Sequence, residues 1–481
     1  MNDTTAASAH ARDKSRTIKN IIDNHGVKLD WQKAFYQDMH ANPELSGFEV
    51  ETARKIAAHL RNFDCEVHTG IGGHGIVAIF RNGDGPTALF RADFDALPVK
   101  ETSGAIYAST RTRVRESGVE TPIMHACGHD MHTTALLGAC AVMDSTRDSW
   151  SGTFVALFQP AEEISVGAAA MVNDGLADII PKPDVCFGQH VIAGPAGRIL
   201  SRPGAALAAC DTITIKLYGK SAHGSMPHNS IDPTYLAAMI VVRLQGIVGR
   251  EINPNDFAVI TVGSLISGHT NNTVPGEATL VLNCRFYDNE VKRKTYQAIK
   301  RVVHGECQAS GCERAPEFRF SNHGELTEND PVVYSHVRYT FDEVFGEESV
   351  DAKRWTASED FTNIPRAFGA PYFFWLVGIT PREQWDKALA EDNIEDIPVN
   401  HAGDFLPDYE PSVDASTKAA LCAVLTYLVD DKSEATIQRP DEANLPKNLP
   451  SDPTEVRSEA VVESANLPDA EAAHRAHELR K

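Results

Sequence analysis

Apolar segments of strand length alternate with helical segments through much of this chain, and this alternation limits the possible folds more than any other feature. Continuously apolar strands flanked by helices are buried on both faces, as in a mostly parallel sheet. We therefore predict an α/β fold with a doubly wound, mostly parallel sheet. The predicted strands are Gly75–Arg81, Thr87–Arg91, Thr153–Phe158, Asp184–Gly188 and Pro371–Gly378, and the predicted helices begin at about Trp31, Val50, His132, Ala168 and Ser416.

A different pattern interrupts this alternation near Cys210. Asp211–Tyr218 alternates apolar and polar residues, which is typical of a strand with one solvated face. Asp232 and Pro233 provide an N-cap and a first-turn proline for a helix that runs to about Arg250. The elements that follow complete the order β-α-β-β-α-β of a split βαβ (ferredoxin-like) sandwich, with strands at Phe257–Gly263, Ala278–Phe286 and Pro316–Phe320 and a helix at Glu290–Ala309.

The two patterns divide the chain into domains. A chain of 481 residues exceeds the length, roughly 250–300 residues, at which single cores stop growing. We expect the smaller unit to be an insertion in the larger one. From Ser433 onward the chain has no Phe, Trp or Tyr, and we expect this acidic tail to remain disordered. The predicted boundaries are an irregular N-terminal extension (1–28), the larger domain in two parts (29–210 and 323–432), the insertion (211–322) and the tail (433–481).

The composition argues against several classes of partner. A formal net charge of -21 disfavours nucleic acid, whose binding depends on clustered Lys and Arg. No apolar stretch approaches the roughly 18–20 residues that cross a bilayer, and the N-terminal sequence lacks the apolar centre of a secretory signal. Nine cysteines scattered from Cys65 to Cys422 do not resemble a disulfide framework. We therefore expect a cytoplasmic protein with reduced thiols and no membrane partner.

The densest group of reactive side chains is MHACGHDMH, which places His125, Cys127, His129, Asp130 and His132 within eight residues. A single Cys-x-His is more often a core cysteine beside scattered histidines. The surroundings of three predicted strands favour a functional site instead.

Carboxylate or imidazole side chains follow three of the predicted strands. In a doubly wound sheet the carboxyl ends of the parallel strands meet at one edge, where ligands bind. The purely structural alternative for two adjacent glutamates is that they complement the dipole of the following helix. The residues concerned are Asp93 and Asp95, Glu162 and Glu163, and His190.

Cys, His and Glu are ligands of first-row divalent ions, with thiolate and imidazole suited to zinc and carboxylate tolerating manganese. One catalytic ion needs three protein ligands and an open position, whereas a larger set suits two ions. One of two adjacent glutamates can then bind metal while its neighbour takes a proton from the attacking water. The pattern predicts a hydrolase with two divalent ions, zinc or manganese first, with cobalt or nickel also compatible.

Ordered motifs from about Trp31 to Leu428 resemble the M20 family of metallopeptidases, and within it the aminoacylase/hippurate hydrolase-like amidohydrolases. Each motif alone is weak, but their shared order is specific. The motifs are HANPELSGFEVET (40–52), RADFDALPVKE (91–101), MHACGHDMHTT (124–134), FQPAEE (158–163), GKSAHGSMPH (219–228), DP (232–233), NNTVP (271–275) and NHAGDF (400–405).

This resemblance implies roles for individual residues of the larger domain. Glu162 is the general base, which deprotonates the water and returns a proton to the leaving amine. Asp93 and Asp130 hold ligating imidazoles from behind, with ordinary capping as the alternative. The implied metal ligands are Cys127, which bridges the two ions, His129, Glu163, His190 and His401.

In the insertion, His223, Asn272 and Arg285 match family positions that face the active site when the domains close. Histidine and asparagine can donate hydrogen bonds to the oxyanion, and arginine can hold the carboxylate of the amino-acid half of the substrate. Loop capping and surface charge are the alternatives. In relatives the histidine at the position of His223 often comes from a partner subunit. The resemblance therefore implies a homodimer through the insertion, which acts as lid and dimerisation domain, and we expect hinges near Ala208–Asp211 and His323.

The implied reaction is hydrolysis of the amide bond of a small-molecule N-acyl amino acid. Details resemble bacterial N-acyl-glutamine aminoacylases, and the loop Ile164-Ser165-Val166, often glycine-rich in relatives, leaves the acyl preference open. A small dipeptidase is the nearest alternative. Other classes are a hydrolase that uses Cys127 as nucleophile, with a neighbouring histidine as base, and a non-catalytic binding scaffold.

Overall fold

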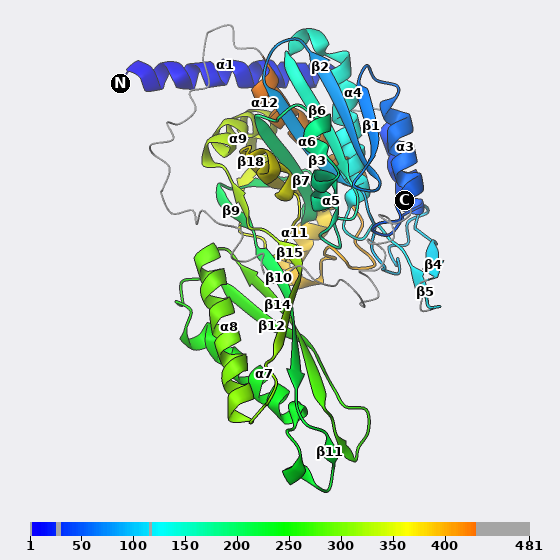
Figure 1. Cartoon of the computed structure of the whole chain (residues 1–481). Coiled ribbons are helices and arrows are strands. Elements are labelled where there is room, and N and C mark those ends of the chain that lie inside the picture. Colours follow the sequence, from blue (N-terminus) through cyan, green and yellow to red (C-terminus); the bar gives the residue numbers. More distant parts are fainter. Residues whose placement is uncertain (1, 26–29, 115–117, 430–481) are drawn as a thin grey trace.

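The computed structural model describes residues 2–25, 30–114 and 118–429. A large body contains an eight-stranded sheet, and a smaller unit built on a four-stranded sheet projects from it (Figure 1). Among the described residues no helix is both long and apolar enough to cross a membrane. The tail predicted at 433–481 lies outside the described residues.

The large sheet is parallel at its centre and antiparallel toward its edges. The four central strands β6, β3, β7 and β18 are all parallel, whereas β2 runs antiparallel to β6 and β8 antiparallel to β18. Strands β3, β6 and β18 are buried along their whole length, as expected of strands covered on both faces. The predicted fold class is confirmed. In sheet order the strands are β1 (Glu66–Ile71), β2 (Gly75–Asn82), β6 (Gly152–Gln159), β3 (Thr87–Asp93), β7 (Val185–Pro195), β18 (Tyr372–Thr380), β8 (Ile199–Ser201) and β17 (Ser349–Asp351).

Two apolar cores lie on opposite faces of this sheet. Ile76, Ala78 and Phe80 of β2 belong to one core, and Val77 and Ile79 of the same strand belong to the other. This division follows from the alternation of side chains along a strand. The first core is covered by α2 (Asp30–Ala41), α3 (Val50–Leu60), α4 (His129–Ser145), α9 (Pro331–Phe345) and α12 (Tyr409–Leu428), and the second by α5 (Gly167–Asn173), α6 (Leu176–Ile179) and α10 (Asn363–Phe368).

The N-terminal segment corrects a prediction. Residues 1–28 were expected to be irregular because they are polar, but α1 (Asn2–His25) is a helix. Ile18, Ile21 and Ile22 are buried, and α1 packs against α9 and α12. Ile21 and Ile22 follow Ile18 by three and four residues, so the three side chains form a narrow apolar stripe on one face of the helix. The prediction rested on the overall polarity of the segment and missed this stripe.

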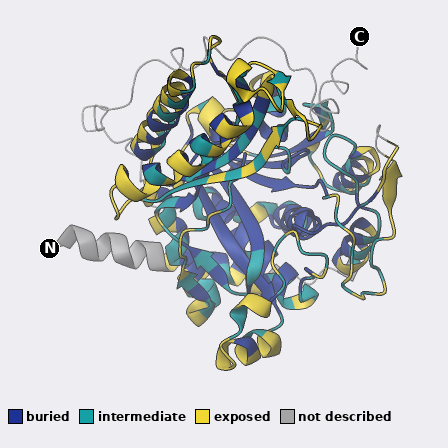
Figure 2. Ribbon diagram, turned by 90° about the horizontal axis from the view of Figure 1, so that it is seen from below, coloured by how far each residue is buried: buried dark blue, intermediate teal, exposed yellow. Residues whose placement is uncertain are grey.

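The smaller unit has the predicted element order. Its antiparallel sheet runs β12-β14-β10-β15, and its two helices pack on one face of that sheet. Buried residues alternate with intermediate ones along most of β10 and β14, and the edge strand β12 has only intermediate and exposed residues, unlike the central strands of the large sheet (Figure 2). We propose 211–322 as the bounds of this insertion. The elements are β10 (Ala209–Tyr218), α7 (Pro233–Arg250), β12 (Ala258–Ser267), β14 (Glu277–Phe286), α8 (Asn289–Ala309) and β15 (Glu317–Gly324), with a short antiparallel pair of β11 (Ala222–His223) and β13 (Thr273–Val274) at the end far from the large body (Figure 1).

The chain passes between the two sheets twice, and ionic side-chain contacts join these two segments. Asp211, at the start of β10, accepts hydrogen bonds from His323 Nδ1 (2.5 Å), Lys292 Nζ (2.8 Å) and the Tyr296 hydroxyl. His323 Nε2 lies 3.0 Å from Glu325 Oε1. Hydrogen bonding to Asp211 and then to Glu325 raises the pKa of His323 to about 9. These contacts lie at the positions where hinges were expected.

We expect His323→Gln to lower the melting temperature at pH 6 by at most about 2–4 °C, since half of the side chain is exposed. The folded chain holds the His323 proton up to about pH 9, whereas an unperturbed histidine loses it near 6.5. The stabilisation is therefore complete below pH 6.5 and is lost as the pH rises through 9. Melting curves at pH 6 and pH 10 measure this, with the exposed His269→Gln as control. An equal loss at both pH values would contradict the ion pair.

Candidate metal centre

The carboxyl edge of the large sheet collects the predicted ligands. Cys127 lies in the turn before α4, and His129 is the first residue of that helix. After β6 the chain turns at Ala161, whose φ of 52° is positive, and delivers Glu162 and Glu163 to this edge. His190 lies within β7, not after it, because the strand continues to Pro195 in register with β18. The strand end predicted at Gly188 was therefore wrong.

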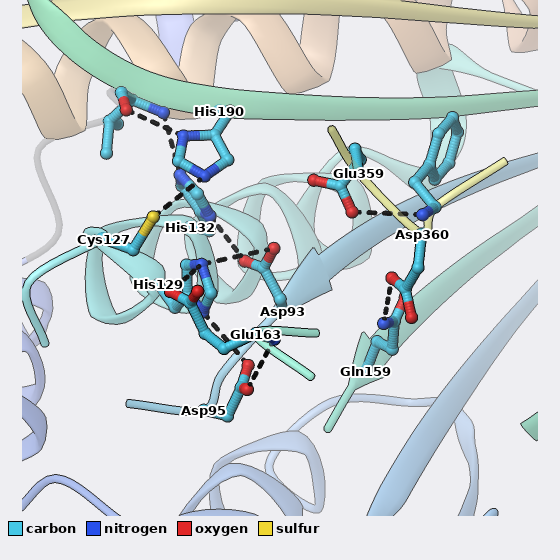
Figure 3. A network of polar contacts seen from close by, with 12 residues as sticks. Asp93, Asp95, Cys127, His129, His132, Gln159, Glu163, His190, Glu359 and Asp360 are labelled. Carbon is cyan, nitrogen blue, oxygen red and sulfur yellow. Dashed lines mark hydrogen bonds and ion pairs between the residues drawn. The ribbon is translucent and has the colours of Figure 1, made fainter. Parts of the chain in front are cut away.

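The five predicted ligands converge. Cys127, His129 and His190 each offer a donor atom within 4.8 Å of the other two, and so do Cys127, Glu163 and His401. Cys127 Sγ lies 3.4 Å from His190 Nε2, as Figure 3 shows. His129 Nε2 lies 3.7 Å from Glu163 Oε1, and His401 Nε2 lies 3.4 Å from Glu163 Oε2. Glu163 therefore stands between two imidazoles, with the thiol of Cys127 beside it.

Two of these donor atoms form no hydrogen bond, although they lie 3.7 Å from each other. His129 Nε2 and Glu163 Oε1 are buried and form no hydrogen bond. Unpaired buried polar atoms are costly, and their occurrence at one spot indicates a missing ligand. Burial, followed by the charges of Glu163 and Glu162, raises the pKa of the Cys127 thiol. A nearby cation would favour the thiolate. Thiol, imidazole and carboxylate donors fit a site for divalent ions.

His401 is held in a strained backbone conformation. Its φ of 73° lies in the left-handed region, which costs a residue other than glycine roughly 1–3 kcal/mol. The His401 N–H donates to the Ala126 carbonyl at 2.8 Å. This bond joins the late loop to the segment that carries Cys127, so it aims the exposed His401 ring at Glu163.

Carboxylates support the imidazoles from behind, but not in the expected pairing. Asp95 Oδ1 accepts from His129 Nδ1 at 3.1 Å, and Asp95 Oδ2 accepts from the Glu163 N–H at 3.0 Å. Asp93 Oδ1 lies 2.5 Å from His132 Nδ1 (Figure 3). Asp130 contacts none of the predicted ligating imidazoles: its carboxylate bonds His40 Nδ1 at 2.7 Å. Asp95 thus takes the position predicted for Asp130.

A buried ionic network lies beside Glu162. Arg91 donates to Asp93 Oδ2 (2.6 Å), Glu359 Oε1 (2.8 Å) and Asp360 Oδ1 (3.2 Å), and all four side chains are at most 1% exposed. Burial, followed by the charges of Glu359, Glu163 and Asp360, raises the pKa of Glu162. No role in the site was predicted for Arg91, Glu359 and Asp360. The one available signal was an arginine at the end of an otherwise apolar strand.

Replacing Arg91 by methionine should destabilise the protein by about 3–5 kcal/mol, because it leaves Asp93, Glu359 and Asp360 buried without their cation. Urea unfolding measures the loss. The matched control is Arg81→Met in β2, a strand of the same sheet; the Arg81 side chain is 57% exposed and forms a surface pair with Glu66. That change should cost less than about 1 kcal/mol. Equal stabilities of the two variants would show that the network carries no net stabilisation.

The structure brings one predicted residue of the insertion to the large body and leaves two away from it. Arg285 Nη1 donates to the Thr356 carbonyl at 2.7 Å. The neighbouring Trp355 ring packs on His190 with centroids 5.2 Å apart. His223 and Asn272 are exposed and lie in and directly before the paired strands β11 and β13, at the end of the insertion far from the large sheet (Figure 1). Within one chain they do not reach the metal centre.

Comparison with known proteins agrees with this geometry. The model of peptidase family M20/M25/M40 matches residues 89–397. The chain is 34% identical to the hippurate hydrolase of Campylobacter jejuni over 348 residues, 72% of this chain and 84% of that protein. It is 31% identical to the N-acetylcysteine deacetylase of Bacillus subtilis over 356 residues, 73% of this chain and 88% of that protein.

A solved structure has a similar fold. The Bacillus subtilis YXEP protein, described as a dinuclear metal binding peptidase from the M20 family, matches with a TM-score of 0.66 and 27% identity. The match covers 82% of this chain and 97% of that one. The family match includes Glu162 and every predicted ligand except His401. The chain therefore belongs to peptidase family M20/M25/M40 and is a hydrolase of amide bonds.

Proposed function

We propose that this protein hydrolyses the amide bond of N-acyl amino acids with two divalent metal ions. The ions, zinc or manganese with cobalt or nickel as alternatives, would be held by Cys127, His129, Glu163, His190 and His401. One observation carries the proposal: these five side chains converge beside Glu162, and two of their buried donor atoms form no hydrogen bond. The relatives named as hippurate hydrolase and N-acetylcysteine deacetylase support the substrate class.

Glu162 is the proposed general base. It removes a proton from the water that attacks the scissile carbonyl and then delivers that proton to the departing amine. Its burial among carboxylates favours the protonated form, so a proton once taken is retained until the amine leaves. When bound, the metal ions supply Lewis acidity to the carbonyl and lower the pKa of the attacking water. Asp95 orients His129, and Asp93 orients His132.

The insertion supplies the remaining groups in this proposal. Arg285 stands at the junction of the two sheets, where its guanidinium would hold the carboxylate of the amino-acid half. His223 and Asn272 would act on the oxyanion of a second subunit, since they lie far from the centre of their own chain. A homodimer through the insertion follows. The edge strand β12 of the insertion carries Leu265 and Ile266, which are 42% and 59% exposed. These exposed apolar side chains support the proposed interface.

The cellular setting is part of the same proposal. All nine cysteines lie in the described residues, and all are free thiols. Reduced thiols are typical of a reducing compartment, so we propose the cytoplasm. The partners are then the small-molecule substrate and a second copy of the chain.

The experiment that tests the proposal is release of free amino acid from a panel of N-acyl amino acids, with and without added zinc, manganese or cobalt. N-acetyl, N-benzoyl and indole-acetyl conjugates sample the acyl group, and unblocked dipeptides test the peptidase alternative. We expect metal-dependent release from at least one acyl class. Cleavage of dipeptides alone, or release that ignores added metal in metal-stripped enzyme, would overturn it.

A further inference from the structure

A buried tyrosine at the junction of the two sheets has an unused hydroxyl. Tyr287 directly follows β14, and its ring packs at a tilt of 43° against Phe257 with centroids 4.6 Å apart. It forms a small apolar cluster with Ala208, Ala209 and Leu326 where the chain crosses between the units. The Tyr287 hydroxyl is buried and has no hydrogen-bond partner. A buried donor without a partner normally marks a missing ligand or water.

One arginine lies against the ring of this tyrosine, and two more act on it through their charge. The Arg354 guanidinium lies 4.7 Å from the centre of the Tyr287 ring. Burial raises the pKa of Tyr287, and the positive charges of Arg354, Arg202 and Arg285 lower it, so all three charges act on the hydroxyl. The Nε of Arg202 is also buried and unpartnered. Two unsatisfied donors, Tyr287 and Arg202, therefore stand in one positively charged region.

None of these arginines has a carboxylate partner within 4.0 Å in the part of the chain that the structure describes. Arg202 and Arg285 donate to the backbone carbonyls of Ala352 and Thr356, which are neutral acceptors. Carboxylates are abundant in this chain, with 66 acidic against 45 basic residues. Arg338, for comparison, pairs with both Asp342 and Asp351. The positive charge of these three arginines is therefore not neutralised by a carboxylate within 4.0 Å in the described residues.

The group adjoins the metal centre and is assembled from both units. Arg202 and Arg354 belong to the large body, whereas Arg285 and Tyr287 belong to the insertion. Trp355 links the two sites. Its backbone N–H donates to the Ala206 carbonyl at 2.9 Å, and its ring packs on His190. A ligand at the metal centre that carried a further negative charge could thus place it against Arg354 and Arg202.

We propose that Arg202 and Arg354, with the Tyr287 hydroxyl, form a binding site for a second carboxylate of the substrate. This inference rests on the proposed function and narrows it: the preferred substrates are N-acyl amino acids with two carboxylates. Arg285 holds the α-carboxylate, and the new site holds the other. That second carboxylate belongs either to an acidic amino-acid side chain or to the far end of a dicarboxylic acyl group, and the two sources share the same chemistry.

Paired substrates test the site and distinguish the sources. N-acetyl-L-glutamate is compared with N-acetyl-L-glutamine, and N-succinyl-L-alanine with N-butyryl-L-alanine, in the metal-loaded enzyme. We expect kcat/KM to favour the acidic member of one pair at least tenfold, and Arg354→Gln or Arg202→Gln to reduce that ratio to about two or less. General structural damage would slow both members of a pair and leave the ratio unchanged. The exposed Arg61→Gln should keep the ratio of the unaltered enzyme.

A binding measurement separates this inference from the proposed reaction. Glutarate has two carboxylates and no amide, so titration calorimetry of the metal-loaded protein reports binding without hydrolysis. We expect Arg354→Gln and Arg202→Gln to weaken glutarate at least tenfold and Arg61→Gln to leave it unchanged. If no N-acyl amino acid is cleaved but glutarate binding shows this pattern, the proposed function fails and the anion site stands. Glutarate binding that is unchanged in Arg354→Gln and Arg202→Gln, or acidic-to-neutral ratios below two for both substrate pairs, would overturn the site.

Discussion

Replacing Glu162 by glutamine should lower kcat on the best N-acyl amino acid by about two to four orders of magnitude while both metal ions stay bound. Glutamine has nearly the shape of glutamate, but it cannot accept the proton of the attacking water. Glu163, not Glu162, lies against the imidazoles of His129 and His401, so the metal donors are unchanged. Amino-acid release measures kcat, and elemental analysis of the same sample measures the metal.

Two comparisons make this result specific. Glu163→Gln, one residue away, should lose metal together with activity, because it weakens a donor to the site. Glu51→Gln on the exposed face of α3 should change neither quantity. A non-catalytic scaffold would lose nothing in Glu162→Gln. Activity of that variant within tenfold of the unaltered enzyme would remove Glu162 from the reaction.

Removal of metal should have the second large effect. Stripping the protein with a chelator should reduce amide hydrolysis to background, and adding back a divalent ion should restore it. His129→Ala should resemble the stripped protein, since it removes a donor that contacts Asp95 on one side and Glu163 on the other. Hydrolysis and bound metal are measured across the titration.

Alkylation of Cys127 distinguishes the metal centre from cysteine-nucleophile chemistry. Bound metal should protect Cys127 from iodoacetamide, and stripping should expose it, as mass spectrometry of the labelled peptide would show. Cys140 is buried in the core away from the proposed ligands and is the internal control. A stripped enzyme that keeps its activity but is inactivated by iodoacetamide would falsify the metal mechanism and favour a thiolate nucleophile.

Most of the large sheet was predictable from local pattern. Apolar runs such as those of β3, β6 and β18 predicted strands within a few residues of their ends, because a strand buried on both faces needs apolar side chains throughout. Helix α1 was missed because its apolar stripe is narrow, and α9 was not predicted at all. Both helices are stabilised by packing on each other and on α12, and such packing has no local signature.

The candidate site was predictable to a similar degree. Cys127 and His129 were found in the densest group of reactive side chains, Glu163 and His190 were found because they follow predicted strands, and His401 was found only through resemblance. The supporting groups were less accessible. The contact of Arg91 with Glu359 joins residues 268 positions apart, and no spacing rule predicts it. Nor could the sequence show that Asp95, and not Asp130, bonds His129.

The sequence by itself determined most of the strands and helices of the large sheet, the order of the elements in the smaller unit and which side chains could bind metal. These properties depend on side-chain chemistry and short-range periodicity, which are local. Only the tertiary structure decided which carboxylate supports which imidazole, that Arg285 reaches the large body while His223 does not, and that three arginines meet at Tyr287 without a carboxylate partner in the described chain. Such pairings depend on distances across the folded chain, and the same residue types in the same order are compatible with many of them.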